Sequence, residues 1–292
     1  MSGQTPIKWL KPKNDFVFKL LFGSEDEASN QLLLAFLNDV FDVPEGQSLV
    51  KVEVLNPTLN KESLEDKESI LDVRAKVLGH GYINIEIQLS NQKNIYKRSL
   101  YYASKLYEGQ LGEGGEYIEL TKVVAINLID FRFFPSDSYR SCYRLREDHT
   151  LEAYPDDLMK LYFFEMPKFK ILDQKGEVAP NDRMAKWLRF LTNSDESRWE
   201  EMAKQDPMLE IGVDKLRIAS MDPKIRMQYE AREKALKDMA SLRGEGRQEG
   251  KQEERERMAI RMLEKEMDLD LIMELTRLSH VELIELRNKL NS

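Results

Sequence analysis

The stretch "SILDVRAKVLGHGYINIEIQLS", residues 69–90, decides how the first half of this chain folds. Its apolar residues alternate with polar ones on both sides of a glycine-rich turn, which predicts two antiparallel strands joined as a hairpin. Acidic or amide side chains occupy positions where a strand usually carries threonine or valine. These side chains are Asp72 in the first strand and Glu86 and Gln88 in the second.

Alternation places the polar side chains of both strands on one side of the hairpin. A three-residue loop at 79–81 sets the expected register and places Arg74 opposite Glu86. In the same register, Asp72 lies opposite Gln88 and diagonal to Glu86. A shift of one residue would put the two carboxylates on opposite faces of the sheet.

Two carboxylates this close repel each other unless a cation lies between them. Oxygen ligands that leave places for water suit Mg²⁺, which also accepts phosphate oxygens. We therefore expect Asp72 and Glu86 to bind Mg²⁺, with the backbone carbonyl of Ile87 as a third protein ligand. Such an ion activates water for attack on a phosphodiester, and Gln88 would hydrogen-bond that water.

The alternative is a sheet with one solvated face and no bound metal. In that case Asp72 and Glu86 pair with the neighbouring cations Arg74 and Lys76, and the alternation has no chemical role. The residues of the hairpin leave both interpretations open.

The composition limits the class of protein. The 292 residues suffice for one large domain with an appendage or for two domains, and 41% hydrophobic residues can form a sizeable core. The net charge of −8 argues against a generally basic surface for nucleic acid but permits a local basic patch. Cys142 is the single cysteine of the sequence, so we expect neither an internal disulfide nor a zinc site. Because no apolar stretch is long enough to cross a membrane, we expect a cytoplasmic protein.

The order of predicted elements indicates an α/β (α+β) fold with helices flanking a mixed sheet. A helix over 13–23 precedes a second helix, which Ser24 and Glu27 open as a capping box and which runs to about Phe41. The other elements expected before residue 180 are a strand at 49–57, a helix at 91–108 and strands at 120–131, 139–146 and 158–165. The run at 120–131 is almost entirely apolar, as in a strand that is buried on both faces.

Four blocks of this sequence resemble a known family. They are "KNDFVFKLLFG" (13–23), "SILDVRAK" (69–76), "INIEIQ" (83–88) and "YKRSLYYASKLY" (96–107), in that order. The chain resembles the Rpn family, the recombination-promoting nucleases also labelled transposases, which belong to the PD-(D/E)XK nuclease superfamily. The resemblance spans nearly the whole chain. It implies a restriction-endonuclease-like αβββαβ core and metal-dependent cleavage of DNA.

The resemblance also implies roles for single residues. Asp72 matches the metal-binding aspartate and Glu86 the second acid. Gln88 stands where the wider superfamily has a lysine, a change that occurs within the Rpn family. Asp15 matches an acidic position in the first helix, where many of these folds place an auxiliary carboxylate. The alternative for Asp15 is an ion pair with Lys19, four residues further along the helix.

The helix expected at 91–108 is a candidate DNA-binding surface. Its first 17 residues contain no acid and carry four cations: Lys93, Lys97, Arg98 and Lys105. Tyr101 lies between Lys97 and Lys105 on one helical stripe, and such stripes hold phosphates and stack on bases. The alternative is an ordinary amphipathic helix with its tyrosines in the core. The residues expected to face the core are Leu100, Ala103, Leu106 and Tyr107.

With this resemblance the chain divides into four expected parts. Residues 1–180 form the nuclease core, 181–242 a helical region, 243–257 a charged Glu/Gly-rich linker or helix, and 258–292 a C-terminal helical hairpin with a capping box at Ser279–Glu282. A hairpin this small is not stable alone, so we expect the C-terminal region to form a homo-oligomer, in the simplest case a dimer. The alternative is a monomeric tail.

The sequence as a whole predicts an endonuclease that depends on Mg²⁺ or another divalent cation and hydrolyses phosphodiester bonds of DNA. Its expected role is recombination, or the processing of mobile-element or phage-related DNA. One alternative is a non-catalytic DNA-binding or assembly protein that retains the fold, with Gln88 marking the loss of activity. A third interpretation is strand exchange, since the residues do not separate cutting from joining.

Overall fold

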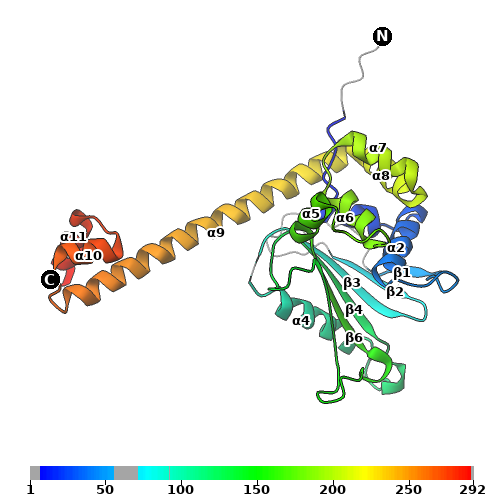
Figure 1. Ribbon diagram of the computed structural model, residues 1–292, viewed down its shortest axis with the longest axis horizontal. Coiled ribbons are helices and arrows are strands. Elements are labelled where there is room, and N and C mark those ends of the chain that lie inside the picture. Colours follow the sequence, from blue (N-terminus) through cyan, green and yellow to red (C-terminus); the bar gives the residue numbers. More distant parts are fainter. Residues whose placement is uncertain (1–6, 56–71, 92, 291–292) are drawn as a thin grey trace, which may run out of the picture. The chain divides into compact units, whose positions relative to one another are not determined.

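A computed structural model describes residues 7–55, 72–91 and 93–290 of the chain. The chain forms a six-stranded sheet in the order β1-β2-β3-β4-β6-β5 (Figure 1). The pairs β3–β4 and β4–β6 are parallel and the outer pairs are antiparallel, so the sheet is mixed, as expected. The strands are β1 (Val52–Val54), β2 (Val73–Val77), β3 (Gly81–Gln88), β4 (Val123–Ile129), β5 (Arg140–Arg144) and β6 (Met159–Glu165).

Helices flank this sheet and make up the C-terminal part of the chain. They are α1 (Asp15–Phe22), α2 (Glu27–Val40), α4 (Ile95–Glu108), α5 (Met166–Lys175), α6 (Met184–Thr192), α7 (Glu196–Gln205), α8 (Pro207–Met221), α9 (Pro223–Leu263), α10 (Leu269–Thr276) and α11 (His280–Leu290). Two short 3₁₀ turns are η1 (Tyr117–Glu119) and η2 (Pro155–Asp157). Over the described ranges, every helix is too short or too polar to span a bilayer.

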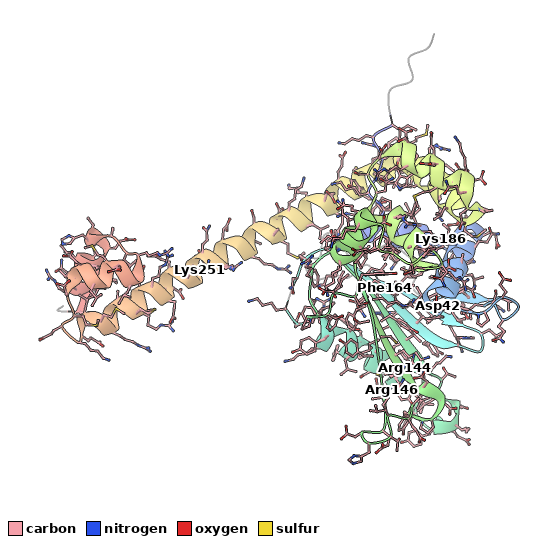
Figure 2. The ribbon with its side chains drawn as sticks, in the orientation of Figure 1. Asp42, Arg144, Arg146, Phe164, Lys186 and Lys251 are labelled. Atoms are coloured by element: carbon pink, nitrogen blue, oxygen red, sulfur yellow. The ribbon has the colours of Figure 1, made fainter. Side chains whose placement is uncertain are left out.

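The main hydrophobic core lies on the sheet face that α1 and α2 cover. Aliphatic side chains of β2, β3 and β4 meet the phenylalanines of these helices there, and Phe164 of β6 is fully buried among them (Figure 2). Trp187 of α6 packs on Phe22 and Phe36 and completes this layer. Helices α6 to α8 therefore share one core with the sheet.

Helix α4 covers part of the opposite face (Figure 1). Its buried Ala103 packs on Val123 and Ala125 of β4, and its first residue packs on the far end of the same strand. Strand β4 is buried on both faces, as its apolar run predicts.

The predicted hairpin forms over the described residues 72–90, but its register differs from the expected one by two residues. The loop is 78–80, and Arg74 pairs with Asn84 instead of Glu86. Gly81 explains why this loop is selected: its φ is +76°, and a Cβ there would lie 2.1 Å from the carbonyl oxygen of Lys122. A shift of two residues keeps every side chain on its expected face.

The start of α2 is also different from the expectation. Asp26, not Ser24, is the N-cap, and its carboxylate accepts a hydrogen bond from the backbone N–H of Ser29 at 2.9 Å. The Ser24 hydroxyl instead donates to the carbonyl of Leu20 in the preceding helix. The expected capping box at Ser24 and Glu27 was therefore wrong, because a stronger cap lies two residues further along.

The chain separates into two compact units, Met1–Glu233 and Lys234–Ser292. The second unit contains residues 243–257, which continue helix α9, followed by α10 and α11. Its small core consists of Ala259, Ile272, Leu278, Leu283 and Leu286. The capping box at Ser279 is confirmed: the Glu282 carboxylate accepts from the Ser279 backbone N–H at 2.7 Å.

Candidate active site

The candidate site lies where β2 begins and β3 nears its end. The last paired residues on these strands are Val73 and Ile85, so one further step places Asp72 beside Glu86. Both carboxylates are buried: Asp72 is 7% exposed and Glu86 is 3% exposed. The two acids are therefore directly opposite, which is closer than the diagonal arrangement that the expected register gave.

Each acid already has a polar neighbour on its own strand. The Arg74 guanidinium donates to the Asp72 carboxylate through Nε at 2.6 Å. The Asn84 amide donates to Oε1 of Glu86 at 3.1 Å. Part of the alternative interpretation is thus present in the structure, since Asp72 pairs with Arg74 as a solvated face would require.

The electrostatics of Glu86 indicate a site that disfavours two negative charges. Burial raises the pKa of the Glu86 carboxyl above its ordinary value, and the guanidinium of Arg98 partly offsets this effect. The negative charge of Asp72 raises the same pKa further. Two neighbouring buried carboxyl groups can both be ionised only when positive charge lies close to them.

One source of positive charge is Lys19, in the last turn of α1. The side chain is 5% exposed, which is rare for lysine. Burial lowers the pKa of its ammonium group, and the charge of Asp72 partly restores it. Among the neighbouring charges, that of Asp72 has the largest effect on this ammonium group.

A second source of positive charge is Arg98 of α4. Its charge lowers the pKa of Glu86, so the guanidinium lies near that carboxyl. The Arg98 side chain is half-buried and also stacks on Tyr102, with 5.8 Å between the guanidinium carbon and the ring centroid. Arg98 was expected to be exposed toward DNA, whereas it is half-buried and its charge lowers the pKa of the Glu86 carboxyl.

 

Two buried oxygen atoms on the same face lack hydrogen-bond donors. Within the part of the chain that the structure describes, Oδ1 of Asn84 and Oε1 of Gln88 are shielded from solvent and accept no hydrogen bond. The Gln88 amide nitrogen donates to the carbonyl of Ser90 at 3.1 Å. The site thus presents an excess of oxygen acceptors, and unsatisfied buried acceptors favour a cation or an ordered water.

The backbone of β3 adds a further oxygen. The N–H of Tyr82 and the C=O of Gln88 both bond toward β4, so in this ladder the residue between Glu86 and Gln88 points its carbonyl toward β2. That residue is Ile87, and β2 is the side on which Asp72 lies. Its carbonyl is therefore directed to the side of the sheet where the expected third ligand is needed.

This donor set fits a hard divalent cation, because it consists of oxygen atoms and carries two carboxylates. Over residues 7–55, 72–91 and 93–290, no three His, Cys, Asp or Glu side chains cluster as a complete metal cage. A site with few protein ligands suits Mg²⁺, which keeps several waters and shares its remaining positions with phosphate.

Asp15 has a different environment from the one expected. Its carboxylate is buried and forms an ion pair with Arg232 of α9, with Nη2 and Oδ2 2.5 Å apart. The cation that it meets is thus Arg232, and not Lys19 in its own helix. Asp15 also accepts a hydrogen bond from the backbone N–H of Phe16 at 2.9 Å, which fixes the carboxylate at the start of α1.

The outer surface of α4 carries the expected basic stripe. Lys97, Tyr101 and Lys105 are exposed on the helix, and Lys93 is exposed just before the helix begins at Ile95. The Lys105 ammonium lies over the Tyr101 ring, 5.4 Å from its centroid. Ala103, Leu106 and Tyr107 contact the sheet as expected. Leu100 was expected in the core and is 48% exposed, because it lies on the outer side of the helix with the cations.

A comparison with models of protein families matches residues 12–245 to the PD-(D/E)XK nuclease family transposases. The match covers most of the chain and includes both buried acids. The chain belongs to this family. The six-stranded mixed sheet with flanking helices and a helical C-terminal region fits the restriction-endonuclease-like fold of these nucleases. No curated protein and no solved structure matches the chain.

Sequence reasoning did not connect Lys19 with Asp72 or Arg98 with Glu86. Lys19 could have been found as a lone lysine inside the apolar run "FVFKLLF", because a lysine in a buried helix needs a partner. The effect of Arg98 on Glu86 has no such local signal, since it depends on how α4 packs on the sheet. The PD-(D/E)XK transposase family match does not assign a role to either residue.

Proposed function

We propose that this protein is a metal-dependent DNA endonuclease in which Asp72 and Glu86 are the central acids. The observation that carries the proposal is their position: two buried carboxylates lie side by side on neighbouring strands of a nuclease-family fold. Buried acids this close are costly to ionise, and proteins keep such pairs chiefly at functional sites.

Asp72, Glu86 and the Ile87 carbonyl would hold the metal, which we assign as Mg²⁺. When bound, Mg²⁺ polarises a phosphodiester and lowers the pKa of a water molecule. The oxygens of Asn84 and Gln88 that lack donors are suited to orient water molecules beside the acids. The metal would also relieve the repulsion that raises the pKa of Glu86.

Lys19 would replace the lysine that the superfamily carries at the position of Gln88. Gln88 is neutral, so it cannot supply positive charge to the phosphate. The buried Lys19 ammonium, under the influence of Asp72, supplies that charge from helix α1. Arg98 would add a second positive charge on the Glu86 side, where it opposes the excess of carboxylates.

The DNA would approach along the exposed side of α4. Lys97 and Lys105 offer phosphate contacts there, Lys93 offers another just before the helix, and Tyr101 offers a ring face. Arg98 on the same helix lowers the pKa of Glu86, so α4 would connect the proposed DNA surface with the proposed catalytic acids. The family description as a transposase supports a role in recombination or mobile-element DNA. We also propose that the protein acts in the cytoplasm.

The test is incubation of the purified protein with supercoiled plasmid, in EDTA, in Mg²⁺ and in Ca²⁺. We expect nicked or linear plasmid in Mg²⁺ and intact plasmid in EDTA, because the acids alone do not activate water. A product mixture that contains joined or recombined molecules would identify strand transfer instead of hydrolysis. Intact plasmid in every divalent cation would contradict the endonuclease.

A second candidate function is a DNA-binding or assembly protein without catalysis. Two observations favour it: Gln88 replaces the superfamily lysine, and Asp72 is already paired with Arg74 at 2.6 Å. Retarded but uncut DNA in a gel-shift experiment, with or without Mg²⁺, would support this candidate over the nuclease.

A further inference from the structure

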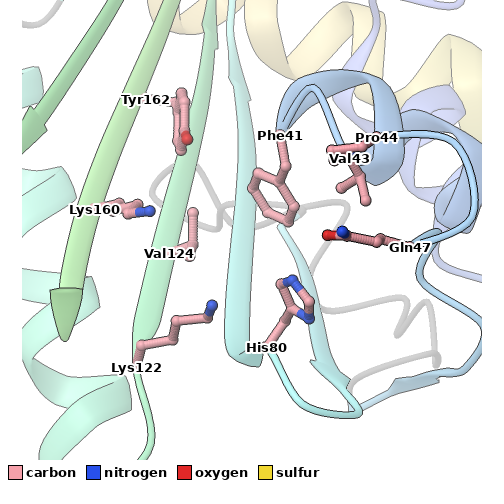
Figure 3. Close-up of a pocket in the computed structure, with 9 residues that line it drawn as sticks. All are labelled: Phe41, Val43, Pro44, Gln47, His80, Lys122, Val124, Lys160 and Tyr162. Atoms are coloured by element: carbon pink, nitrogen blue, oxygen red, sulfur yellow. The ribbon is translucent and has the colours of Figure 1, made fainter. Parts of the chain in front are cut away.

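A pocket on the other face of the sheet has no role in the proposed cleavage of DNA. It lies between the loop after α2 and the first residues of β4 and β6, with a cavity volume of about 230 Å³ (Figure 3). Val124 and Tyr162 of its wall alternate with the residues that face α4, so the pocket and Glu86 lie on opposite faces.

Polar groups from separate parts of the chain converge on this pocket. Figure 3 shows the ammonium groups of Lys122 and Lys160, the His80 ring and the Gln47 amide all directed toward its interior. They come from the start of β4, from β6, from the β2–β3 loop and from the loop after α2. A few converging polar groups on an otherwise apolar wall are typical of a small-molecule site.

The charge of the pocket is positive. The Asp157 carboxylate beside them is already shared between Lys160 at 2.6 Å and Arg144 at 3.3 Å (Arg144 is labelled in Figure 2). Burial lowers the pKa of Lys122, and the neighbouring charge of Lys160 lowers it further. Two ammonium groups that repel each other in a half-buried site favour an anion between them.

His80 adds a buried nitrogen with unused hydrogen-bonding capacity. Its Nδ1 atom is shielded from solvent and has no hydrogen-bond partner in the described part of the chain. The His80 ring is nearly parallel to the Phe41 ring, with 7° between the planes and 6.5 Å between the centroids. The centroid of the Tyr162 ring lies 5.9 Å from that of the Phe41 ring. These rings give the pocket an aromatic wall beside its cations.

We propose that this pocket binds a small phosphate monoester that carries a flat ring, of the class of nucleoside monophosphates. The phosphate lies between Lys122 and Lys160, and the ring packs on the aromatic wall formed by Phe41, His80 and Tyr162. The cavity volume of about 230 Å³ limits the ligand to a single small molecule.

The test is calorimetric titration of the full chain with thymidine 5′-monophosphate in EDTA, which removes any metal-dependent binding at the acids. We expect one molecule bound per chain. Thymidine, which has the ring without the phosphate, and inorganic phosphate, which has the charge without the ring, should each bind about tenfold more weakly or worse. Absence of binding of the monophosphate would overturn the proposal. Equal affinity for inorganic phosphate would overturn the assignment of the ring.

Two variants locate the site. Lys122→Met should weaken binding about tenfold, because it removes a charge-assisted hydrogen bond, and Lys204→Met on the exposed surface of α7 is the matched control. Gln47→Glu changes an exposed side chain and adds a negative charge at the pocket, so it should weaken binding without unfolding the protein. Asp72→Asn should leave the affinity unchanged. Loss of binding in Asp72→Asn with full binding in Lys122→Met and Gln47→Glu would move the ligand to the acids and overturn the proposal.

Discussion

Arg232 is held against Asp15 by a buried ion pair that joins residues 217 positions apart. The guanidinium Nε donates to both carboxylate oxygens at 3.1 Å, in addition to the shorter contact of Nη2. The next residue, Glu233, accepts a hydrogen bond from the Asn14 amide at 3.0 Å. These contacts make the first turns of α9 part of the nuclease fold, beside the helix that carries Lys19.

Replacing Arg232 by methionine should destabilise the first unit by about 3–5 kcal/mol, because it leaves the Asp15 carboxylate buried without its counter-charge. Urea unfolding followed by circular dichroism measures this change. Arg247→Met, on an exposed part of the same helix, is the control and should stay within about 0.5 kcal/mol of the unchanged protein.

Asp15 and Arg232 also separate a structural role from a catalytic one. If Asp15 only neutralises the buried charge of Arg232, then Asp15→Asn and Arg232→Met should each lower the free energy of unfolding. Both variants should still cleave DNA at low temperature, where they are folded. If Asp15 is the auxiliary carboxylate that the family resemblance implies, Asp15→Asn should lose cleavage under conditions in which Arg232→Met is still folded and active.

The cations of α4 should fall into two classes. Lys97→Ala combined with Lys105→Ala should weaken binding to all DNA sequences alike and reduce the salt slope by about 2, because each phosphate contact releases a counterion. Filter binding at several salt concentrations measures both effects. Arg98→Ala should lower cleavage more than binding, because Arg98 acts on Glu86. Equal effects of all three substitutions on the salt slope would show that Arg98 contacts DNA directly.

The hairpin shows how far the sequence determines the site. Alternation fixed which side chains share a face, so the two acids were placed together from the sequence alone. The register was not determined, because Gly79 and Gly81 both adopt positive φ and permit two loops of the same length. Which of the two loops forms depends on the close approach of Gly81 to the backbone of Lys122, a contact between segments that are distant in the sequence.

The remaining differences have the same physical origin. Ser24 and Asp26 are both good N-caps, and Asp26 is selected where Lys215 of a distant helix pairs with its carboxylate. The ion pair of Asp15 depends on a helix more than two hundred residues away. Local patterns predicted the helices, the strands and the buried faces, whereas partners of charged side chains depend on tertiary packing.

The C-terminal unit should mediate self-association. Its core contains few side chains, and apolar residues remain exposed on its helices, among them Leu271, Leu275 and Val281. A chain shortened to residues 1–242 keeps Arg232 and Glu233 and should therefore stay folded. Light scattering should give a smaller oligomer for the shortened chain than for the full chain. The same number of subunits in both would contradict this role.

Asp72→Ala should abolish cleavage of plasmid and leave the fold and most DNA binding intact. Asp72 is one of two carboxylates proposed to hold the metal, so its loss removes the activation of water while the phosphate contacts of α4 remain. Glu53→Ala, an exposed acid on β1, is the matched control and should cut at the unchanged rate. Cleavage by Asp72→Ala at the rate of the unchanged protein would mean that these acids form only a polar sheet face.

Gln88→Lys and Lys19→Met together test where the positive charge of the site comes from. If Lys19 supplies the charge that Gln88 lacks, Lys19→Met should reduce cleavage by about 10²-fold or more, the usual effect of removing one group that stabilises transition-state charge. Gln88→Lys alone should retain or increase activity, and in the Lys19→Met background it should restore part of the lost rate, because a cation returns to the same site from β3. Plasmid cleavage measured under single-turnover conditions gives these rates, and thermal melting confirms that each variant is folded. An unchanged rate in Lys19→Met would show that the buried lysine only supports the packing of α1, and the charge at the phosphate would then come from Arg98 or from the metal alone.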